Sequence, residues 1–128
     1  GRSKYVTQVM VCGDSRKHLA ALVVPDREAL EQYARSSGIA FEDYAGLLKT
    51  DEIRELISGE IAGVNKTAPS YEQVRGFELL PEAFTLENGM LTPTLKPRRG
   101  RITMIHEELI ERMYEHLDAR PAAGGDSG

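Results

Sequence analysis

The chain has 128 residues, of which 41% are hydrophobic and 28% charged, a composition typical of a globular domain rather than of a disordered chain. Its 16 basic and 20 acidic residues leave a formal net charge of -4, so the chain as a whole does not attract nucleic acid or anionic lipid. A single cysteine, Cys12, excludes an internal disulfide framework. No apolar run approaches the ~20 residues of a membrane-spanning helix, and no signal peptide opens the sequence. We therefore expect one soluble domain in the cytoplasm.

The first part of the chain predicts a β-hairpin and then a helix. Residues 8–12 and 19–24 are short apolar runs rich in β-branched side chains, and the polar residues between them suit a loop. The short loop favours antiparallel pairing of these two strands. Asp26 then stands where a helix N-cap belongs, and the helix is expected to end at residues 36–38.

The middle of the chain predicts a second helical region and a third strand. Residues 41–49 are ambiguous, with apolar spacing that suggests a short helix. Thr50 is a good N-cap for a longer helix, whose apolar stripe continues to Val64 and which must end before Pro69. Residues 73–80 are apolar enough for a strand.

The last part predicts a hairpin, a loop and a long helix. Asn88-Gly89 lies between the short apolar runs 84–86 and 90–92, and this dipeptide is a strong hairpin signal. Residues 102–117 carry apolar side chains on one continuous helical face. We expect an α+β domain over residues 1–117, with a small, mostly antiparallel sheet of two hairpins plus a strand covered by helices. Residues 118–128 are expected to form a disordered tail.

Few residues of the chain have the spacing of a known catalytic or metal site. The sequence has no glycine-rich phosphate loop, no dinucleotide motif, no nucleophile elbow and no zinc motif. His18, His106 and His116 lack the spacing of metal ligands, so we expect no metal site. Cys12 lies within a predicted strand with no adjacent basic residue, which favours a buried and unreactive thiol.

The loop between Pro93 and the last helix is the exception. It concentrates positive charge in an acidic domain, and its basic residues are Lys96, Arg98, Arg99 and Arg101. Pro93 and Pro97 restrict the loop, so Lys96 loses little freedom when it becomes ordered. The loop could be solvated, could bind phosphate or another anion, or could contact nucleic acid. Nucleic acid is disfavoured because no aromatic residue is interleaved with the basic ones.

Several segments, in order, resemble one family. The segment ENGMLTPTLKPRR (residues 87–99) resembles the C-terminal lysine motif of long-chain fatty acyl-CoA synthetases, which belong to the adenylate-forming superfamily. The segments QVMVCGDSRKHLAALVVP (residues 8–25) and TAPSYEQVRGFELL (residues 67–80) are similar to a strand-loop-strand and a later strand of the same family. IERMY (residues 110–114) resembles its closing helix.

The resemblance implies a function for the basic loop. Lys96 corresponds to the catalytic lysine of acyl-adenylate formation, and the flanking residues of the substrate and nucleotide loop are Gly89, Thr92, Pro93, Thr94, Leu95, Arg98 and Arg99. The substrates implied are a fatty acid, ATP and CoA, with ATP and Mg²⁺ bound mainly by an N-terminal adenylation domain that this chain lacks. The small domain is expected to rotate as a lid between adenylate and thioester formation, and to be inactive alone.

Two features leave alternatives open. Pro97 replaces the small or branched apolar residue that is usual in the family, which makes the loop stiffer. Arg16 and Lys17 in the first hairpin loop could meet the phosphates of CoA, although exposed basic loop residues are common. The alternative to a ligase lid is a stand-alone module that binds an anion or nucleotide through residues 96–101. The parent is expected to be cytoplasmic, with peripheral membrane association left open.

Overall fold

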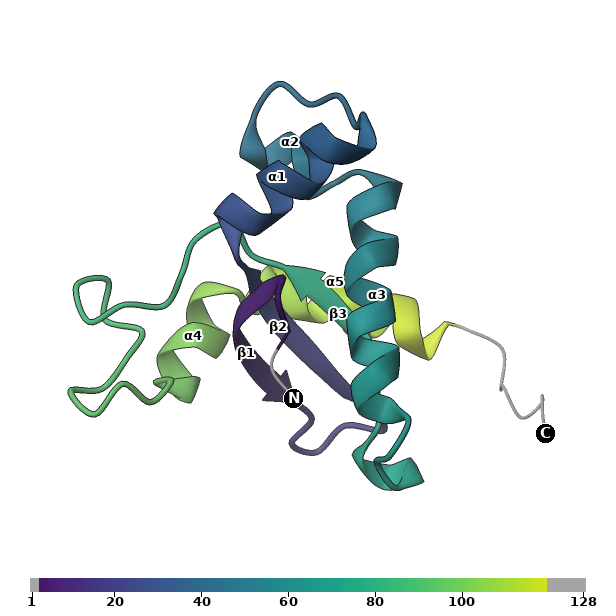
Figure 1. Cartoon of the computed structure of the whole chain (residues 1–128). Coiled ribbons are helices and arrows are strands. Elements are labelled where there is room, and N and C mark those ends of the chain that lie inside the picture. The colour runs from purple at the N-terminus through teal and green to yellow at the C-terminus, as the bar shows by residue number, and fades with distance from the viewer. Residues whose placement is uncertain (1–2, 120–128) are drawn as a thin grey trace.

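The computed structural model describes residues 3–119 of the chain (Figure 1). It contains three strands, β1 (Val6–Cys12), β2 (Leu19–Pro25) and β3 (Val74–Leu79). The helices are α1 (Arg27–Ser37), α2 (Tyr44–Leu47), α3 (Asp51–Asn65), the 3₁₀ turn η1 (Ser70–Glu72), α4 (Arg99–Ile105) and α5 (Glu107–Asp118). Within the described part of the chain, no helix is long and apolar enough to cross a membrane. The α+β class expected from the sequence is confirmed.

The sheet is mixed, with the order β1-β2-β3. The hairpin of β1 and β2 is antiparallel, as predicted, but β3 pairs with β2 in parallel. A parallel neighbour requires a long crossover, and the three helices α1 to α3 supply it. All residues of β2 after Leu19 are buried, as expected for a central strand covered on both faces.

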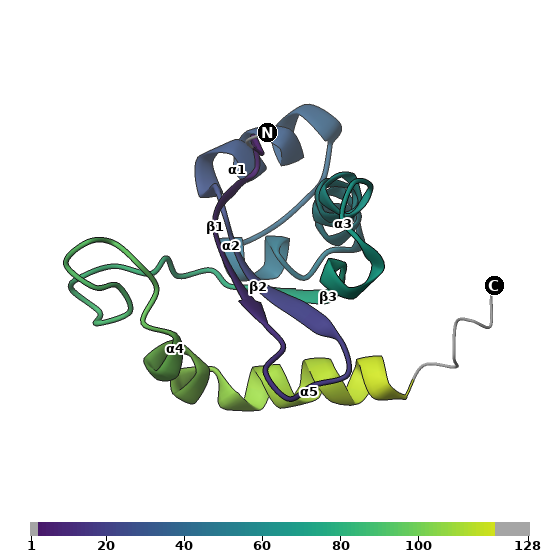
Figure 2. The ribbon, with the colours of Figure 1, turned by 90° about the horizontal axis from the view of Figure 1, so that it is seen from below.

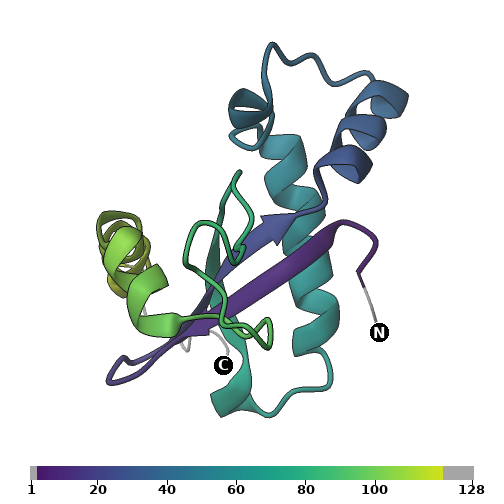
Figure 3. The ribbon, with the colours of Figure 1, turned by 90° about the vertical axis from the view of Figure 1, so that its left-hand side faces the viewer.

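Helices cover both faces of the sheet and make two apolar cores (Figures 2 and 3). Alternate residues of β2 point to opposite faces, so Leu22 and Val23 belong to different cores. The core under α4 and α5 contains Met10, Cys12, Ala20, Leu22, Val24, Leu80, Phe84, Met90, Ile102, Ile110, Met113, Tyr114 and Leu117. The core under α1 to α3 contains Ala21, Val23, Leu30, Ala34, Tyr44, Leu47, Leu48, Ile53, Ile57 and Leu79. Apolar side chains of the crossover helices and of the C-terminal helices therefore pack on opposite faces of β2.

The helix starts follow the predicted caps. The Asp26 carboxylate accepts from the Ala29 N–H at 3.1 Å, and α1 ends before Gly38, which has a left-handed φ of 72°. The Thr50 hydroxyl accepts from the Ile53 N–H at 3.3 Å at the start of α3. Side-chain capping thus fixes the residues at which α1 and α3 begin.

The predicted hairpin around Asn88-Gly89 is wrong. Residues 85–90 instead form a single helical turn, in which the Met90 N–H donates to the Thr85 carbonyl at 3.1 Å and the Gly89 N–H donates to the Leu86 carbonyl at 3.0 Å. This pair of bonds with a left-handed glycine, φ 78°, is the pattern that ends helices. Asn88 strengthens the turn, since its side-chain oxygen accepts from the N–H groups of Thr85 and Met90. Local hydrogen bonding therefore overrides the hairpin preference of Asn-Gly.

The predicted continuous helix over residues 102–117 is also divided. It bends at His106, where φ is −104° and ψ is 25°, into α4 and α5. Ile102 is buried, but Ile105 is 49% exposed and leaves the apolar face on which the sequence placed it. The basic residues Arg99 to Arg101, expected in the loop, already belong to α4. Asp118, expected in the tail, ends α5, and residues 120–128 lie outside the described residues.

The face of β1 beside α3 is less covered than the rest of the sheet. Val9 and Val11 are 46% and 38% exposed, and Val64 of α3 is 68% exposed. These valines border a hollow of about 750 Å³ between the strand and the helix. The tightly packed part of the domain is thus centred on β2 rather than on β1.

The free edge of β3 is covered by side chains. The Asn65 amide donates to the Val74 carbonyl at 2.8 Å and accepts from the Val74 N–H at 2.9 Å, as a neighbouring strand would. The Arg54 guanidinium donates to the Phe77 carbonyl at 3.3 Å. These contacts occupy groups that would otherwise invite pairing with another chain.

We expect Asn65→Ala to lower the free energy of unfolding by about 1–3 kcal/mol. The backbone N–H and carbonyl of half-buried Val74 would both lose the hydrogen-bond partner that Asn65 provides. Urea unfolding followed by circular dichroism measures this. Lys66→Ala, at the exposed next position, is the control and should change the value by less than about 0.5 kcal/mol. Equal effects of the two variants would contradict the structural role of Asn65.

Candidate functional site

The turn that carries Lys96 is closed by its own hydrogen bonds. The Leu95 N–H donates to the Thr92 carbonyl at 2.7 Å, and the Thr92 N–H donates to the Lys96 carbonyl at 2.8 Å. The Thr92 hydroxyl accepts from the Lys96 N–H at 3.1 Å and lies 3.2 Å from the Thr94 hydroxyl. Pro93 occupies the second position of the turn, where its fixed φ is favourable. Backbone geometry therefore fixes the point from which the Lys96 side chain leaves the domain.

Leu95 has an uncommon backbone conformation at this turn. Its φ is 65°, in the left-handed region, where a residue often completes a three-residue hairpin loop. Leu91 and Pro97 form the bridge on either side, so the hairpin that the sequence placed at residues 84–92 occurs here instead. A left-handed conformation costs a residue other than glycine roughly 1–2 kcal/mol. Leu95 is 64% exposed, so the hydrogen bonds of the turn rather than packing hold it in this conformation.

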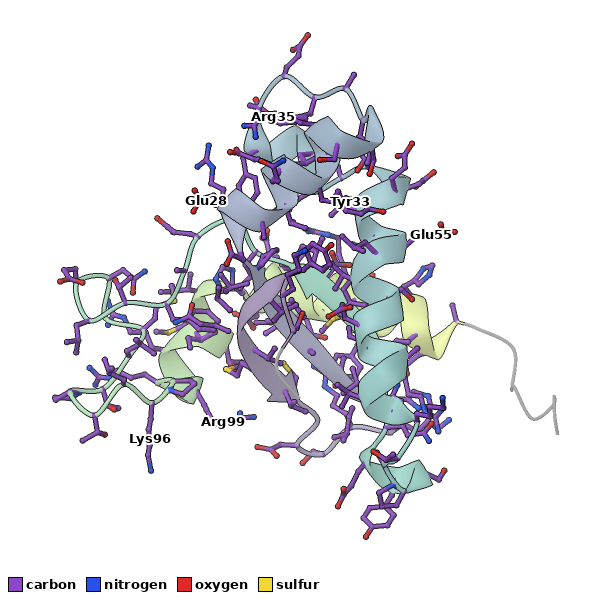
Figure 4. All side chains as sticks on the ribbon, in the orientation of Figure 1. Glu28, Tyr33, Arg35, Glu55, Lys96 and Arg99 are labelled. Atoms are coloured by element: carbon purple, nitrogen blue, oxygen red, sulfur yellow. The ribbon has the colours of Figure 1, made fainter. Side chains whose placement is uncertain are left out.

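The Lys96 side chain points away from the body of the domain (Figure 4). It is exposed, and among residues 3–119 it has no ion pair and no side-chain hydrogen bond. A lysine ammonium is a compact charge that needs an anionic or polar partner when it is removed from water. The geometry therefore leaves this ammonium available to an anion outside the domain.

The two arginines that follow are placed differently from each other. Arg98 is attached through its backbone, whose N–H donates to the Met90 carbonyl at 2.8 Å, while its side chain is exposed. Arg99 begins α4, and its guanidinium donates to the Val11 carbonyl of β1 at 2.6 Å. In Figure 4 the Arg99 side chain extends toward β1 while Lys96 extends away from it. Of these two predicted loop residues, Arg99 thus contacts β1, whereas Lys96 extends away from the strand.

The backbone of Gly89 lies against the side chain of Arg101, a residue of α4. A side-chain carbon added at Gly89 would lie 2.8 Å from Nε of Arg101, so the Arg101 guanidinium covers the glycine backbone. The sequence predicted Gly89 as a loop residue but did not predict this contact with Arg101. No pattern in the sequence indicates this contact, because sequence spacing does not reveal which backbone a side chain will cover.

The first hairpin loop offers Arg16 as a second cation, but its charge is already paired. Arg16 forms an ion pair with Glu111 and lies 4.3 Å from the centre of the Tyr114 ring. Burial raises the pKa of the nearby Cys12 thiol, and the charges of Arg99 and Arg16 only partly oppose this effect. Cys12 is therefore a buried thiol held in its protonated form, in agreement with the sequence interpretation.

The histidines lie apart from the lysine turn. His106 is at the bend between α4 and α5, and burial lowers its pKa. His18 and His116 belong to the first hairpin loop and to α5. Over residues 3–119, no group of three or more metal-binding side chains is assembled.

This fold and loop correspond to a known family over almost the whole chain. A family model described as the AMP-binding enzyme C-terminal domain matches residues 1–118. The chain belongs to this family. The family resemblance of the lysine motif and of the flanking strands is thereby confirmed.

This AMP-binding C-terminal domain is similar to curated ligases. It is 37% identical over 121 residues to long-chain-fatty-acid–CoA ligase 1 of Cavia porcellus, covering 91% of this chain and 17% of that protein. It is 35% identical over 125 residues to the peroxisomal long chain acyl-CoA synthetase 7 of Arabidopsis thaliana, covering 92% of this chain and 17% of that protein. The chain thus spans about one sixth of the length of these relatives.

Solved structures of adenylation domains contain a similar fold. The domain superposes on part of the adenylation domain of a carboxylate reductase from Mycobacterium chelonae with a TM-score of 0.68, at 34% identity, covering 86% of this chain and 16% of that one. A carboxylic acid reductase didomain from Segniliparus rugosus, solved with AMP, gives a TM-score of 0.67 at 28% identity, covering 93% of this chain and 15% of that one. The fold of this chain is therefore shared with part of the adenylation domains of these reductases.

The two glycines that flank the lysine turn should respond in opposite ways to alanine. Gly89→Ala is expected to lower the free energy of unfolding by roughly 1–2 kcal/mol, because Gly89 has a φ of 78° and contacts Arg101. Gly100→Ala, within α4 and without a neighbour within 4 Å, should raise it by up to about 1 kcal/mol. Urea unfolding of both variants measures this difference, and a shared sign would contradict the described loop.

Proposed function

We propose that this domain is the lysine-bearing lid of an AMP-forming long-chain fatty acid–CoA ligase. The observation that carries the proposal is the Lys96 ammonium, which stands exposed and unpaired, within the described chain, on a hydrogen-bonded turn. The identities of 35% and 37% to curated long-chain ligases support the choice of substrate class. The activity belongs to the full-length parent, and the domain alone is expected to be inactive.

The chemistry of the first step explains why an unpaired ammonium is needed. The fatty acid carboxylate attacks the α-phosphorus of ATP, the bond to pyrophosphate breaks, and an acyl-adenylate forms. Two anions must approach each other, and the transfer depends on positioning and on neutralisation of the oxygen charges. Lys96 would supply one positive charge, on a flexible stem, to the carboxylate and the α-phosphate together.

The second step has a different requirement. The CoA thiol attacks the acyl carbon and AMP leaves, so the thiol needs a clear path rather than an added cation. A lid that carries Lys96 can swing away once the adenylate has formed. The separation of Lys96 from the body of its domain, visible in Figure 4, suits a group that enters a neighbouring cleft and leaves it again.

The residues that bind Mg²⁺ and most of the nucleotide are expected in the N-terminal domain of the parent. ATP implies Mg²⁺ in this reaction, but residues 3–119 hold no cluster of metal-binding side chains. We therefore assign Mg²⁺ and most of the nucleotide contacts to the N-terminal adenylation domain of the parent. The part of this domain offered to the nucleotide is the loop around Lys96, with the exposed side chain of Arg98 beside it.

Structural similarity favours a second candidate function, that of a carboxylate reductase adenylation domain. The TM-score of 0.68 to such a domain supports it, at 34% identity. In both candidates Lys96 would serve adenylate formation, and the two differ in what receives the acyl group. Release of acyl-CoA from fatty acid, ATP and CoA by the parent supports the ligase, whereas adenylate formation without a CoA product rules out the ligase and leaves the second candidate.

In the full-length parent, Lys96→Ala is expected to slow ATP–pyrophosphate exchange about 100- to 1000-fold, the loss typical of one preorganised donor. Thioester formation from added acyl-adenylate should stay close to the wild-type rate, because that step does not use the lysine. Lys49→Ala, another exposed lysine, is the control for lost charge. Equal losses in both half-reactions would refute the assigned role.

A further inference from the structure

We propose that Arg99 is the positioning residue that holds the Lys96 turn against the domain. This inference rests on the proposed function of Lys96. The sequence grouped Arg99 with the residues of the nucleotide loop, but its guanidinium is directed to the Val11 carbonyl at 2.6 Å. A charged donor on a carbonyl makes a stronger hydrogen bond than a neutral one. Arg99 therefore connects the end of the lysine turn to the sheet.

The contact between Arg99 and Val11 lies where it can hold the lysine turn on the sheet. β1 is an edge strand, so one row of its backbone groups has no strand partner, and Val11 lies next to the end of this strand. Arg99 is the first residue of α4 and follows Lys96 by three residues. A single side chain thus joins the start of α4, the exit of the lysine turn and the sheet.

The base of the loop is also held by packing, since the side chains of Met90 and Ile102 are buried in the core under α4 and α5. The backbone N–H of Arg98 donates to the Met90 carbonyl, and Arg101 lies against Gly89. The first of these contacts joins two parts of the loop, and the second joins α4 to the loop. The Arg99 bond instead reaches β1, so it determines the direction in which the turn projects from the domain.

A misplaced ammonium is costly for catalysis. Displacement of a catalytic group by 1 Å can reduce a rate by about 100-fold. If the Arg99 anchor is lost, the closed turn survives through its own hydrogen bonds, but it can rotate about its base. The expected defect is therefore in the rate of adenylate formation rather than in the binding of ATP.

The first test uses the 128-residue chain and does not depend on activity. In ¹H–¹⁵N heteronuclear NOE measurements, Arg99→Ala should lower the values for Leu95 and Lys96, while Arg98→Ala should leave them at the wild-type level. Arg99→Lys should restore part of the loss, since a lysine can still donate to the Val11 carbonyl. Urea midpoints of all variants report whether the fold is intact. Unchanged NOE values in Arg99→Ala, or equal losses in Arg98→Ala, overturn the inference.

The second test uses the full-length parent. Arg99→Ala should lower kcat for ATP–pyrophosphate exchange about 10- to 100-fold with little change in KM for ATP, and Arg99→Lys should recover part of kcat. A rise in KM for ATP with kcat unchanged would identify Arg99 as a nucleotide contact and overturn the positioning role. A fully active Lys96→Ala would refute the proposed function, while the NOE comparison would still decide the anchoring of the turn.

Discussion

The position of the Lys96 ammonium depends on the hydrogen bonds between Thr92 and Lys96 that close the turn. Those bonds hold Leu95 in a left-handed conformation and set the direction of the lysine stem. A flexible loop would have to order itself at each catalytic cycle, at a cost of roughly 1–2 kcal/mol for every backbone residue fixed. In the closed turn this ordering occurs during folding, so in the proposed role the ammonium would be in place before substrate binds.

The rest of the domain provides a rigid base for this turn. β2 is buried on both faces and receives helices from the crossover on one side and from the C-terminal end on the other (Figure 2). Tyr114 connects α5 to the first hairpin, since its hydroxyl donates toward the carbonyls of Cys12 and His18 at 3.1 and 2.9 Å. The proposed lid motion would require such a rigid base, because motion within the domain would displace Lys96 from its position.

Local signals in the sequence predicted local structure well. Asp26 and Thr50 cap helices as expected, and the first hairpin pairs as expected. Two predictions failed, for different reasons. Asn88 bonds to the backbone of its own turn instead of forming a hairpin. The bend at His106 removes Ile105 from an apolar face that periodicity alone had made continuous.

The candidate site was predictable as a list of residues but not as an arrangement. The family motif and the concentration of charge both indicated the loop, whereas the different directions of Lys96 and Arg99 follow from a contact with Val11, 88 residues earlier. The most direct measurement is a crystal structure of the parent with a non-hydrolysable acyl-adenylate analogue in the adenylate-forming state. The account predicts Lys96 Nζ within about 2.7–3.2 Å of an oxygen of the α-phosphate or of the acyl carboxylate. A structure of that state with Lys96 in solvent, and another cation at those oxygens, would contradict it.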